Sequence, residues 1–428
     1  MKREYGVAGL MALTAMFTLA GYEFMRSAST VLFKNAYGAE NLPLVMALMP
    51  FVVFGTVWVY GHILSLLGPR RTLLVTAIGS AALILACYLV LLTGARWITP
   101  VLFLIKEVYV VLLIEQYWSY INSSVSPTTS RRVNGPVTGV AGFGSTIGAF
   151  LVALTVVEYG TEAMILFGAL ALLPAALLAN LTYSIHGEPE VPPPTGAVRS
   201  HMGWRWLREN PTLFYLLMIV LSTQVVAAVL DFKFNELLSE SFACRDGGFE
   251  GWQWTAIGAL LPTELVCGQD GETALLGWFW GTLNSFSLIL QFIGAPLLLA
   301  FVSLRYVHIM MPVVHLAAIT FAVLEPSVFT VGLALLLFKA FDYSIFRAAK
   351  EVLYVPLSFD ERYRAKEIID VFGYRTGKGA SSVVIVALQK LGVVMGNYYI
   401  GIAFVAVALW LALIFPLTAR ARAIRQES

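Results

Sequence analysis

Ionisable side chains lie inside several of the long apolar runs of this sequence, where a charge is costly unless it meets a partner or a polar path. Arg can hold phosphate or carboxylate with two parallel hydrogen bonds, and Lys acts as a mobile point charge. As a group, these residues predict a polar path that suits an anionic solute. The group consists of Arg26, Lys106, Glu107, Asp231, Lys233, Lys339, Asp342, Arg347, Lys350, Glu351, Asp370, Arg375 and Lys378.

Single members of this group also have a structural interpretation. The pairs Lys339–Asp342 and Arg347–Glu351 have the i,i+3 and i,i+4 spacing at which side chains pair along one helix. Charges near the cytoplasmic ends of the predicted helices could form ion pairs that hold the two halves in one conformation, and so act as a gate. The aromatic residues near the charges could stack a base or a sugar, or could simply pack; they are Tyr22, Tyr117, Trp118 and Tyr343.

No arrangement typical of an enzyme accompanies these charges. The five histidines show no metal-ligand spacing with cysteine or with each other. There is no G-x-S-x-G elbow, and residues 373–379 differ in spacing from a P-loop. One apolar run is rich in glycine, which favours close helix packing over phosphate binding; its glycines are Gly135, Gly139, Gly142, Gly144 and Gly148. We therefore do not expect an enzyme.

The elements that carry the charges are predicted to be membrane-spanning helices. Of the 428 residues, 58% are hydrophobic and 13% are charged, and the mean hydropathy is +0.78. Soluble domains have about 25% charged residues, and a spanning helix needs about 20 mainly apolar residues. We therefore expect an all-α integral membrane protein. Its twelve runs are Gly6–Val31, Leu42–Leu67, Leu73–Thr93, Pro100–Ile121, Val137–Val157, Ala163–Leu181, Leu213–Leu230, Leu275–Val302, Val307–Leu324, Val328–Val352, Ser381–Val394, which could begin near Phe372, and Tyr398–Leu417.

Basic residues outside the runs predict the orientation in the membrane. Alternate connecting segments carry sixteen Lys and Arg residues, and the intervening segments carry little beyond Lys34, Arg96 and Arg245. The positive-inside rule then places both termini in the cytoplasm. The first run begins close to Met1, with no transit peptide or cleavage site, which predicts a multi-pass protein of a bacterial inner membrane.

The chain is predicted to divide near its middle. Residues 186–210 contain EPEVPPP, several basic residues and no apolar run, as expected of a cytoplasmic linker. Six runs lie in residues 1–185 and six in residues 211–428. Two six-helix halves joined in this way resemble the major facilitator superfamily, in which substrate binds between the halves near the bilayer midplane. The loop from Gly61 to Arg71 also resembles a loop of that superfamily, although two of its charged positions are lost here.

One long segment is predicted to lie outside the membrane. Residues 236–274 form an outer loop that could be a cap or a partner surface. Cys244 and Cys267 share this loop, where an oxidising compartment would permit a disulfide. Spacing alone fixes no disulfide geometry, so free thiols are the alternative.

The segment Lys339–Ala380 resembles the signature of the ATP/ADP antiporter family, the nucleotide transporters of plastids and obligate intracellular bacteria. The family pattern is close to K-x-x-x-Y-S-x-F-x-x-x-K-E-x-x-Y-x-P-L, followed by K-x-x-I-D-V-x-x-x-x-x-G-K. Weaker similarity involves the first, fourth and seventh spans. The matching signature residues are Lys339, Tyr343, Ser344, Phe346, Lys350, Glu351, Tyr354, Pro356, Leu357, Lys366, Ile369, Asp370, Val371, Gly377 and Lys378.

The resemblance implies a major-facilitator-like fold that exchanges nucleotides across a membrane. Glu107 and Lys378 match charged positions that are important for transport in the family, and Asp231, close to Lys233, could stand where the family has an acidic and a basic residue at the end of the seventh span. The family's exchangers read D-T-K-D after the first-span Arg, and here Ser29 replaces the lysine that faces the phosphates. Lys106 is the candidate to replace that cation.

We therefore predict a secondary transporter that moves a nucleotide or another phosphorylated anion by alternating access, by exchange of the ATP/ADP type. We expect a monomer in the lipid bilayer, with a small anionic substrate such as ATP or ADP, no nucleic acid partner and no bound cofactor. The predicted substrate-binding residues are Arg26, Lys106, Glu107, Asp231 and Lys378. The predicted gating residues are Arg347, Lys350, Glu351, Asp370 and Arg375.

Two other functions stay open at this point. The transported solute could instead be a lipid or another amphiphile, and for either solute the energy could come from protons, with Glu107 or Asp231 as the proton carrier. It could also be a membrane scaffold that docks through residues 236–274 and transports nothing.

Overall fold

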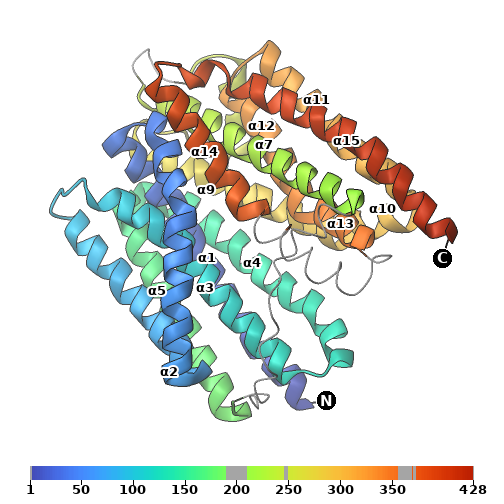
Figure 1. Cartoon of the computed structure of the whole chain (residues 1–428). Helices are drawn as coiled ribbons and strands as arrows, with labels where there is room; N and C mark the ends of the chain where they lie inside the picture. The colour runs from blue at the N-terminus through green and yellow to red at the C-terminus, as the bar shows by residue number, and fades with distance from the viewer. Residues whose placement is uncertain (1, 189–209, 245–248, 355–368, 370–372, 428) are drawn as a thin grey trace.

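The computed structural model describes residues 2–188, 210–244, 249–354, 369 and 373–427. Within these residues the regular structure is helical, with no strand. A helix satisfies its own backbone in lipid, as the long apolar runs require. Figure 1 shows two groups of helices, α1–α5 in the N-terminal half and α7–α15 in the C-terminal half.

The N-terminal half is built from five long helices. Its second helix bends at Gly68, whose φ of 73° lies in the left-handed region that favours glycine. Predicted spans two and three are therefore the two arms of one bent helix. The elements are α1 (Lys2–Tyr37), η1 (Ala39–Asn41), α2 (Leu42–Leu91), α3 (Ile98–Ser124), α4 (Pro127–Tyr159) and α5 (Thr161–His186).

The C-terminal half has two helices that pass through a π-turn, in which the backbone widens for one turn. The first path runs through α9, η2 and α10, and the second runs through α12, η3 and α13. The elements are α7 (Pro211–Phe242), α8 (Trp252–Leu260), α9 (Gln269–Ile289), η2 (Leu290–Gly294), α10 (Ala295–Phe301), α11 (Leu304–Leu324), α12 (Val328–Phe341), η3 (Asp342–Phe346), α13 (Arg347–Tyr354), α14 (Tyr374–Lys390), η6 (Met395–Asn397) and α15 (Tyr399–Glu427).

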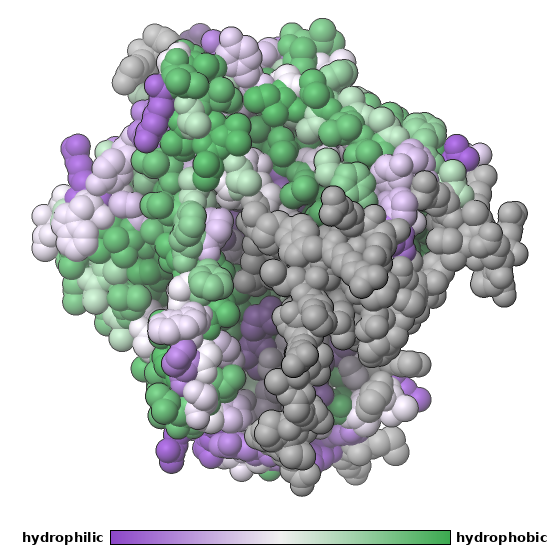
Figure 2. Space-filling model, in the orientation of Figure 1, coloured by the Kyte–Doolittle hydropathy of each residue, from purple (hydrophilic) through white to green (hydrophobic). Residues whose placement is uncertain are grey.

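The count of membrane spans follows from these helices. Among the described residues, nine helical stretches are long and apolar enough to cross a membrane. One of them, Ala39–Leu91, has 53 residues and contains both arms of the bent helix. The charged helix α3 and the 17-residue helix α14 complete the set. The predicted fold, with twelve spans in two six-helix halves, is confirmed. Figure 2 shows that apolar side chains cover much of the described surface in that view.

Each half has its own apolar core, and the two cores meet at more than one place. Buried residues of α1–α5 form one cluster, and buried residues of the C-terminal helices form the other. The second cluster also takes in Val31 and Phe33 of α1, Leu42 and Val45 of α2 and Phe103 of α3. Apolar packing therefore joins the halves near the end of α1 and the start of α2, and also where α4 packs against α9.

Glycines of α4 and α9 permit the closest helix contacts. A Cβ atom at Gly148 of α4 would lie 2.6 Å from the backbone of Ala20 in α1. A Cβ atom at Gly277 of α9 would lie 2.7 Å from the backbone nitrogen of Ala153 in α4. Such distances are too short for a real Cβ, so these sites need glycine. The interpretation of the glycine-rich run as a packing surface is confirmed.

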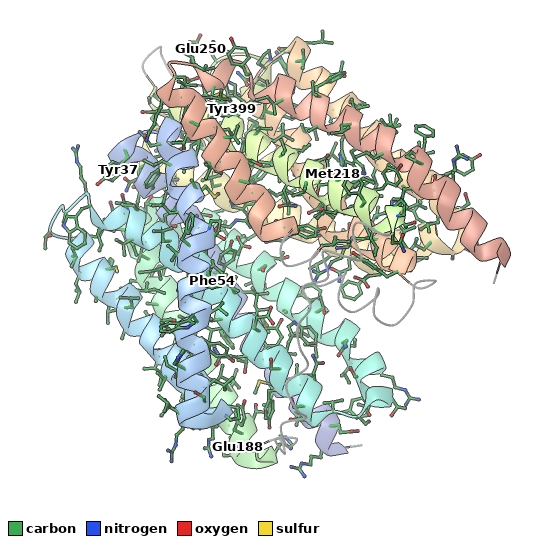
Figure 3. All side chains as sticks on the ribbon, viewed as in Figure 1. Tyr37, Phe54, Glu188, Met218, Glu250 and Tyr399 are labelled. Carbon is green, nitrogen blue, oxygen red and sulfur yellow. A yellow bond between two sulfur atoms is a disulfide. The ribbon has the colours of Figure 1, made fainter. Side chains whose placement is uncertain are left out.

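The two ends of the bundle differ in their contacts. At one end Arg3 donates to the carbonyl of His186, and Ser126 donates to the Glu4 carboxylate. The opposite end holds residues 34–41, Thr161 and residues 269–272, and we call it the remote end. In Figure 3, Tyr37, Glu250 and Tyr399 mark the remote end, and Glu188 lies at the other. The two halves converge toward the remote end in Figure 1.

The segment predicted as an outer loop, 236–274, is largely helical where the structure describes it. α7 continues to Phe242, and α9 begins at Gln269 with two carboxylates in its first turn, where they favour a helix N-terminus. Hydropathy does not detect these polar helix ends. Cys244 and Cys267 form a disulfide, with their Cα atoms 6.0 Å apart. The disulfide ties the end of α7 to the start of α9.

Candidate functional site

A row of polar residues follows one face of α1 from its middle toward the remote end. Glu23, Arg26, Thr30 and Lys34 are spaced by three or four residues, so they lie above one another on the helix. A polar stripe of this kind inside a membrane helix needs partners from other helices. The partners come from α3, α7 and α9.

Arg26 lies between aromatic rings and a carboxylate. Its guanidinium carbon is 3.3 Å from the ring centroid of Trp280 in α9 and 5.7 Å from that of Tyr22. Its Nη1 atom lies 3.5 Å from Oε1 of Glu23, which accepts a 3.0 Å hydrogen bond from Asn284 of α9. A desolvated cation–π contact contributes about 2 kcal/mol. These contacts join the middle of α1 to the C-terminal half.

Lys106 brings an ammonium group from α3 to α1. Its Nζ atom donates to Oγ1 of Thr30 at 2.9 Å, lies 3.5 Å from the ring centroid of Phe103, and is 3.9 Å from Oε1 of Glu107. The neighbouring Ser29 is fully buried, and its hydroxyl has no hydrogen-bond partner among the described residues. Lys106 therefore brings a cation to the part of α1 that holds Ser29 and Thr30, and its role as a substitute for a lysine at position 29 stays a prediction.

Asp231 of α7 pairs with Lys378 of α14. The Lys378 Nζ atom lies 3.7 Å from Oδ2 of Asp231, and the two side chains are 29% and 13% exposed. The Asn235 amide, one turn further along α7, donates to the Asp231 backbone carbonyl at 2.9 Å. Lys378 is thus the most accessible cation of the site, and its partner comes from the same half.

Electrostatic interactions connect these groups across the halves. The Asp231 carboxylate interacts with Lys378, Lys339, Arg26 and Lys106. The structure therefore brings the five predicted substrate-binding residues to one place. We call these residues, together with Glu23 and Lys339, the central cluster. Its members are Glu23, Arg26, Lys106, Glu107, Asp231, Lys339 and Lys378.

Some members and neighbours of the central cluster were not selected from the sequence. Glu23 stands at i,i+3 from Arg26, a spacing that could have identified it. Trp280 and Asn284 lie in an apolar run without charge, so no pattern in that run marks them. Among the described residues no group of His, Cys, Asp and Glu is arranged to hold a metal ion.

A second polar group joins the halves at the remote end. The Lys34 ammonium donates to Oε1 of Glu272 and, at 2.9 Å, to Oδ1 of Asn235. The Ser239 hydroxyl donates to the same Glu272 oxygen at 3.1 Å. The side chains of Lys34 and Glu272 are 0% and 3% exposed. We call Lys34, Asn235, Ser239 and Glu272 the remote lock, which the sequence analysis did not foresee.

Further hydrogen bonds between the halves surround the remote lock. The Asn35 amide donates to the Gln269 side chain at 2.9 Å. The backbone nitrogen of Thr161 donates to Oδ1 of Asp270 at 2.8 Å, and its hydroxyl donates to the same oxygen at 2.7 Å. The first turn of α9 is therefore bound to both α1 and α5.

Two of the predicted gating residues make contacts in the described structure. The Lys350 Nζ atom lies 4.8 Å from the ring centroid of Tyr374 at the start of α14. Arg347 interacts electrostatically with Tyr117 of α3, which belongs to the other half. Glu351 lies beside them in α13. The remaining members, Asp370 and the side chain of Arg375, lie outside the described residues, so the gate stays a prediction.

The sequence comparisons each cover only part of the chain. Residues 249–421 match the family model described as TLC ATP/ADP transporter. ADP,ATP carrier protein 1 of Rickettsia prowazekii is 28% identical over 200 residues, which are 44% of this chain and 38% of that protein. The protein of the same name from Chlamydia muridarum is 36% identical over 83 residues, 19% of this chain and 15% of that protein. The match thus spans less than half the length of these curated relatives.

The structural comparisons cover nearly the whole chain. The crystal structure of a point mutant of the nucleoside transporter NupG has a TM-score of 0.65 at 10% identity, with 96% of this chain and 99% of that chain covered. A bacterial homologue of the iron transporter ferroportin has a TM-score of 0.64 at 13% identity, with 96% of this chain and 98% of that chain covered. At such low identities the likeness shows the fold alone.

Proposed function

We propose, on the premise that this chain belongs to the ATP/ADP antiporter family, that it is a secondary transporter which exchanges a nucleotide or another phosphorylated anion by alternating access. The family match at residues 249–421 supports the premise. The proposal places the protein in a bacterial inner membrane with both termini in the cytoplasm, as its basic residues predict. The remote end then faces outward.

The observation that carries the proposal is the central cluster. Four cations and three carboxylates meet there from both halves. The excess of cations suits phosphate groups, which Arg and Lys bind with charge-assisted hydrogen bonds. A solute bound at this junction touches both halves, so it binds their alternative arrangements with different affinity. Such a difference is what couples binding to a change of conformation.

The remote lock supports alternating access. Contacts that join the halves at one end must break when the protein opens there, and new contacts must form at the other end. The remote lock and the hydrogen bonds around it are contacts that must break when the remote end opens. The match to the ATP/ADP transporter family supports exchange as the mode of transport. The contacts between the halves support alternating access in general and do not distinguish exchange from other modes.

A competition experiment tests the class of substrate. Proteoliposomes take up labelled ATP in the presence of ADP, AMP, adenosine or phosphate. We expect ADP to compete strongly and adenosine to compete at least roughly tenfold more weakly, because a charge-assisted contact to phosphate contributes about 1.5–3 kcal/mol. The Lys233→Met variant is the control, since Lys233 pairs with Glu236, outside the central cluster. Equal competition by adenosine and ADP would refute phosphate recognition by the cluster.

A further inference from the structure

We propose that Glu23 is a proton-binding site, and that it couples the movement of protons to the movement of the anionic solute. Arg26 neutralises Glu23 when the site is empty and neutralises the solute when the site is filled, and Glu23 then takes up a proton. The proposal rests on the proposed function and adds the ion that moves with the solute. It concerns a carboxylate that was not selected from the sequence.

Glu23 is a buried carboxylate with one oxygen in use and one without a partner. Its Oε1 atom lies 3.5 Å from Nη1 of Arg26 and accepts the 3.0 Å hydrogen bond from Asn284. Its Oε2 atom is buried and has no hydrogen-bond partner among the described residues. A proton can therefore be added at Oε2 without breaking an existing hydrogen bond.

The negative charge of Glu23 depends on Arg26. An opposite charge nearby favours the ionised form of a carboxyl group, and burial disfavours it. Arg26 is the cation that forms an ion pair with Glu23 in the described structure. The nearby Lys106 has partners of its own, because its ammonium donates to Thr30 at 2.9 Å and lies 3.9 Å from Glu107. Arg26 is thus the counter-charge that keeps Glu23 ionised.

An incoming anion reaches Arg26 before it reaches Glu23. The Arg26 side chain is 14% exposed, and that of Glu23 is 2% exposed. An anion that binds the guanidinium takes over the positive charge that balances Glu23. The carboxylate is then a charge without a counter-ion inside the membrane, which is strongly disfavoured. Uptake of one proton at Oε2 removes that charge, so the anion and the proton bind together.

The two carboxylates considered as proton carriers in the sequence analysis have more contact with solvent. The Glu107 side chain is 29% exposed, and that of Asp231 is 13% exposed. Water can solvate these two groups when their lysine partners turn to a solute, so they can stay ionised. Glu23 is too deeply buried for that, and the loss of its partner therefore requires a proton.

The other groups that face Glu23 supply no second counter-charge. α9 contributes Asn284 and Trp280, which do not ionise. α4 and α5 place Gly148 and Gly168 against this part of α1. The tyrosines nearby are uncharged at neutral pH. The ionisable groups around Glu23 come from α1 and α3, and they are Tyr22, Arg26, Lys106 and Tyr109.

The cycle balances in charge and in protons. On the side where the solute enters, water supplies the proton, and Glu23 binds it at Oε2 as Arg26 turns to the solute. On the other side the solute leaves, Arg26 pairs with Glu23 again, and the proton returns to water. Each anion is thus accompanied by one proton. Linkage requires the reverse effect as well, so a proton on Glu23 strengthens the binding of the anion.

The pH dependence of ADP binding to purified protein tests the proposal, at pH values where the phosphates of ADP are fully ionised. Binding that takes up one proton should weaken by about tenfold for each pH unit. Glu23→Gln is neutral and keeps an oxygen that accepts from Asn284, so its affinity should stay nearly constant and exceed that of the unchanged protein at the alkaline end. The matched control is Glu236→Gln, which removes a carboxylate that pairs with Lys233 within one helix and should keep the pH dependence.

A second measurement needs no solute. Arg26→Met removes the counter-charge, so Glu23 should carry a proton in the empty protein. The infrared spectrum should then gain a carboxylic acid carbonyl band that is lost again when Glu23→Gln is added. The first measurement stays decisive if Arg26→Met fails to fold.

Three results would overturn the proposal. One is an unaltered pH dependence in Glu23→Gln. Another is a pH dependence that disappears in Glu107→Gln or Asp231→Asn instead. The third is folded Arg26→Met protein without the additional band. A failure of the proposed function is distinguishable, because the unchanged protein would then bind no ADP, while the infrared band would still decide whether Glu23 binds a proton.

Discussion

The Glu272→Gln variant is expected to open the remote end, so that a cysteine placed at Val31 becomes at least roughly a hundredfold more reactive toward a membrane-impermeant maleimide. The Lys34 side chain is fully buried, and Glu272 is its one carboxylate partner among the described residues. Removing one partner of a buried ion pair costs about 3–5 kcal/mol. Because this pair joins the two halves, the cost falls on the closed arrangement. Val31 is buried in that arrangement and reports its loss.

The controls for this prediction are a background without a free thiol, a second Glu→Gln variant and a double variant of the ion pair. The experiment is made with Cys87→Ala, since Cys87 is a free thiol. Glu236→Gln removes a carboxylate that is 27% exposed and pairs within one helix, so labelling should change less than about threefold. Lys34→Met added to Glu272→Gln should recover much of the closure, because no buried charge is then left unpaired. Unchanged labelling in folded Glu272→Gln protein would show that the remote lock does not hold the halves together.

Lys378→Ala is expected to lower exchange by about ten- to a hundredfold. The substitution removes the most accessible cation of the central cluster and leaves the Asp231 carboxylate without the partner at 3.7 Å. Losing a charge-assisted contact to a phosphate of the substrate costs about 1.5–3 kcal/mol. The measurement is the initial rate of labelled ATP uptake into vesicles that contain ADP.

Two further variants separate a role in transport from a role in folding. Lys390→Ala lies at the far end of the same helix and should transport normally. Adding Asp231→Asn to Lys378→Ala should restore thermal stability, because it removes the unpaired carboxylate, but it should not restore exchange. Full activity of Lys378→Ala would remove this lysine from the mechanism.

The central cluster could be predicted because charge is conspicuous inside an apolar run. Arg26, Lys106, Asp231 and Lys378 each interrupt or border such a run, and burial in a membrane is too costly for them without partners. The two-half fold then implied that they meet between the halves. Lys339 was visible by the same criterion, but its i,i+3 spacing to Asp342 also permitted a local ion pair, which made a structural role the alternative.

The remote lock could not be predicted from local patterns. Lys34 and Glu272 are 238 residues apart, and each lies near the end of an apolar run. Charged residues at such ends commonly serve as interfacial anchors. Only the packing of α1 against α9 shows that these two side chains are buried and face each other.

Helix boundaries show a similar limit of hydropathy. α14 begins at Tyr374, before the apolar run at Ser381, because glycines and Lys378 lower the hydropathy of a segment that is still helical. The bend at Gly68 does fall where hydropathy drops between the runs Leu42–Leu67 and Leu73–Thr93, but the π-turns have no hydropathy signal. Their positions depend on the packing of neighbouring helices, which a single run of sequence does not contain.

Counter-flow in proteoliposomes tests the central claim most directly. Vesicles are loaded with unlabelled ADP, with phosphate or with buffer alone, and labelled ATP is added outside. The proposed exchange of phosphorylated anions predicts rapid uptake in vesicles that contain ADP and little uptake in those that contain buffer alone. Uptake that does not depend on the internal solute, or no uptake by folded protein under any of the three conditions, would contradict it.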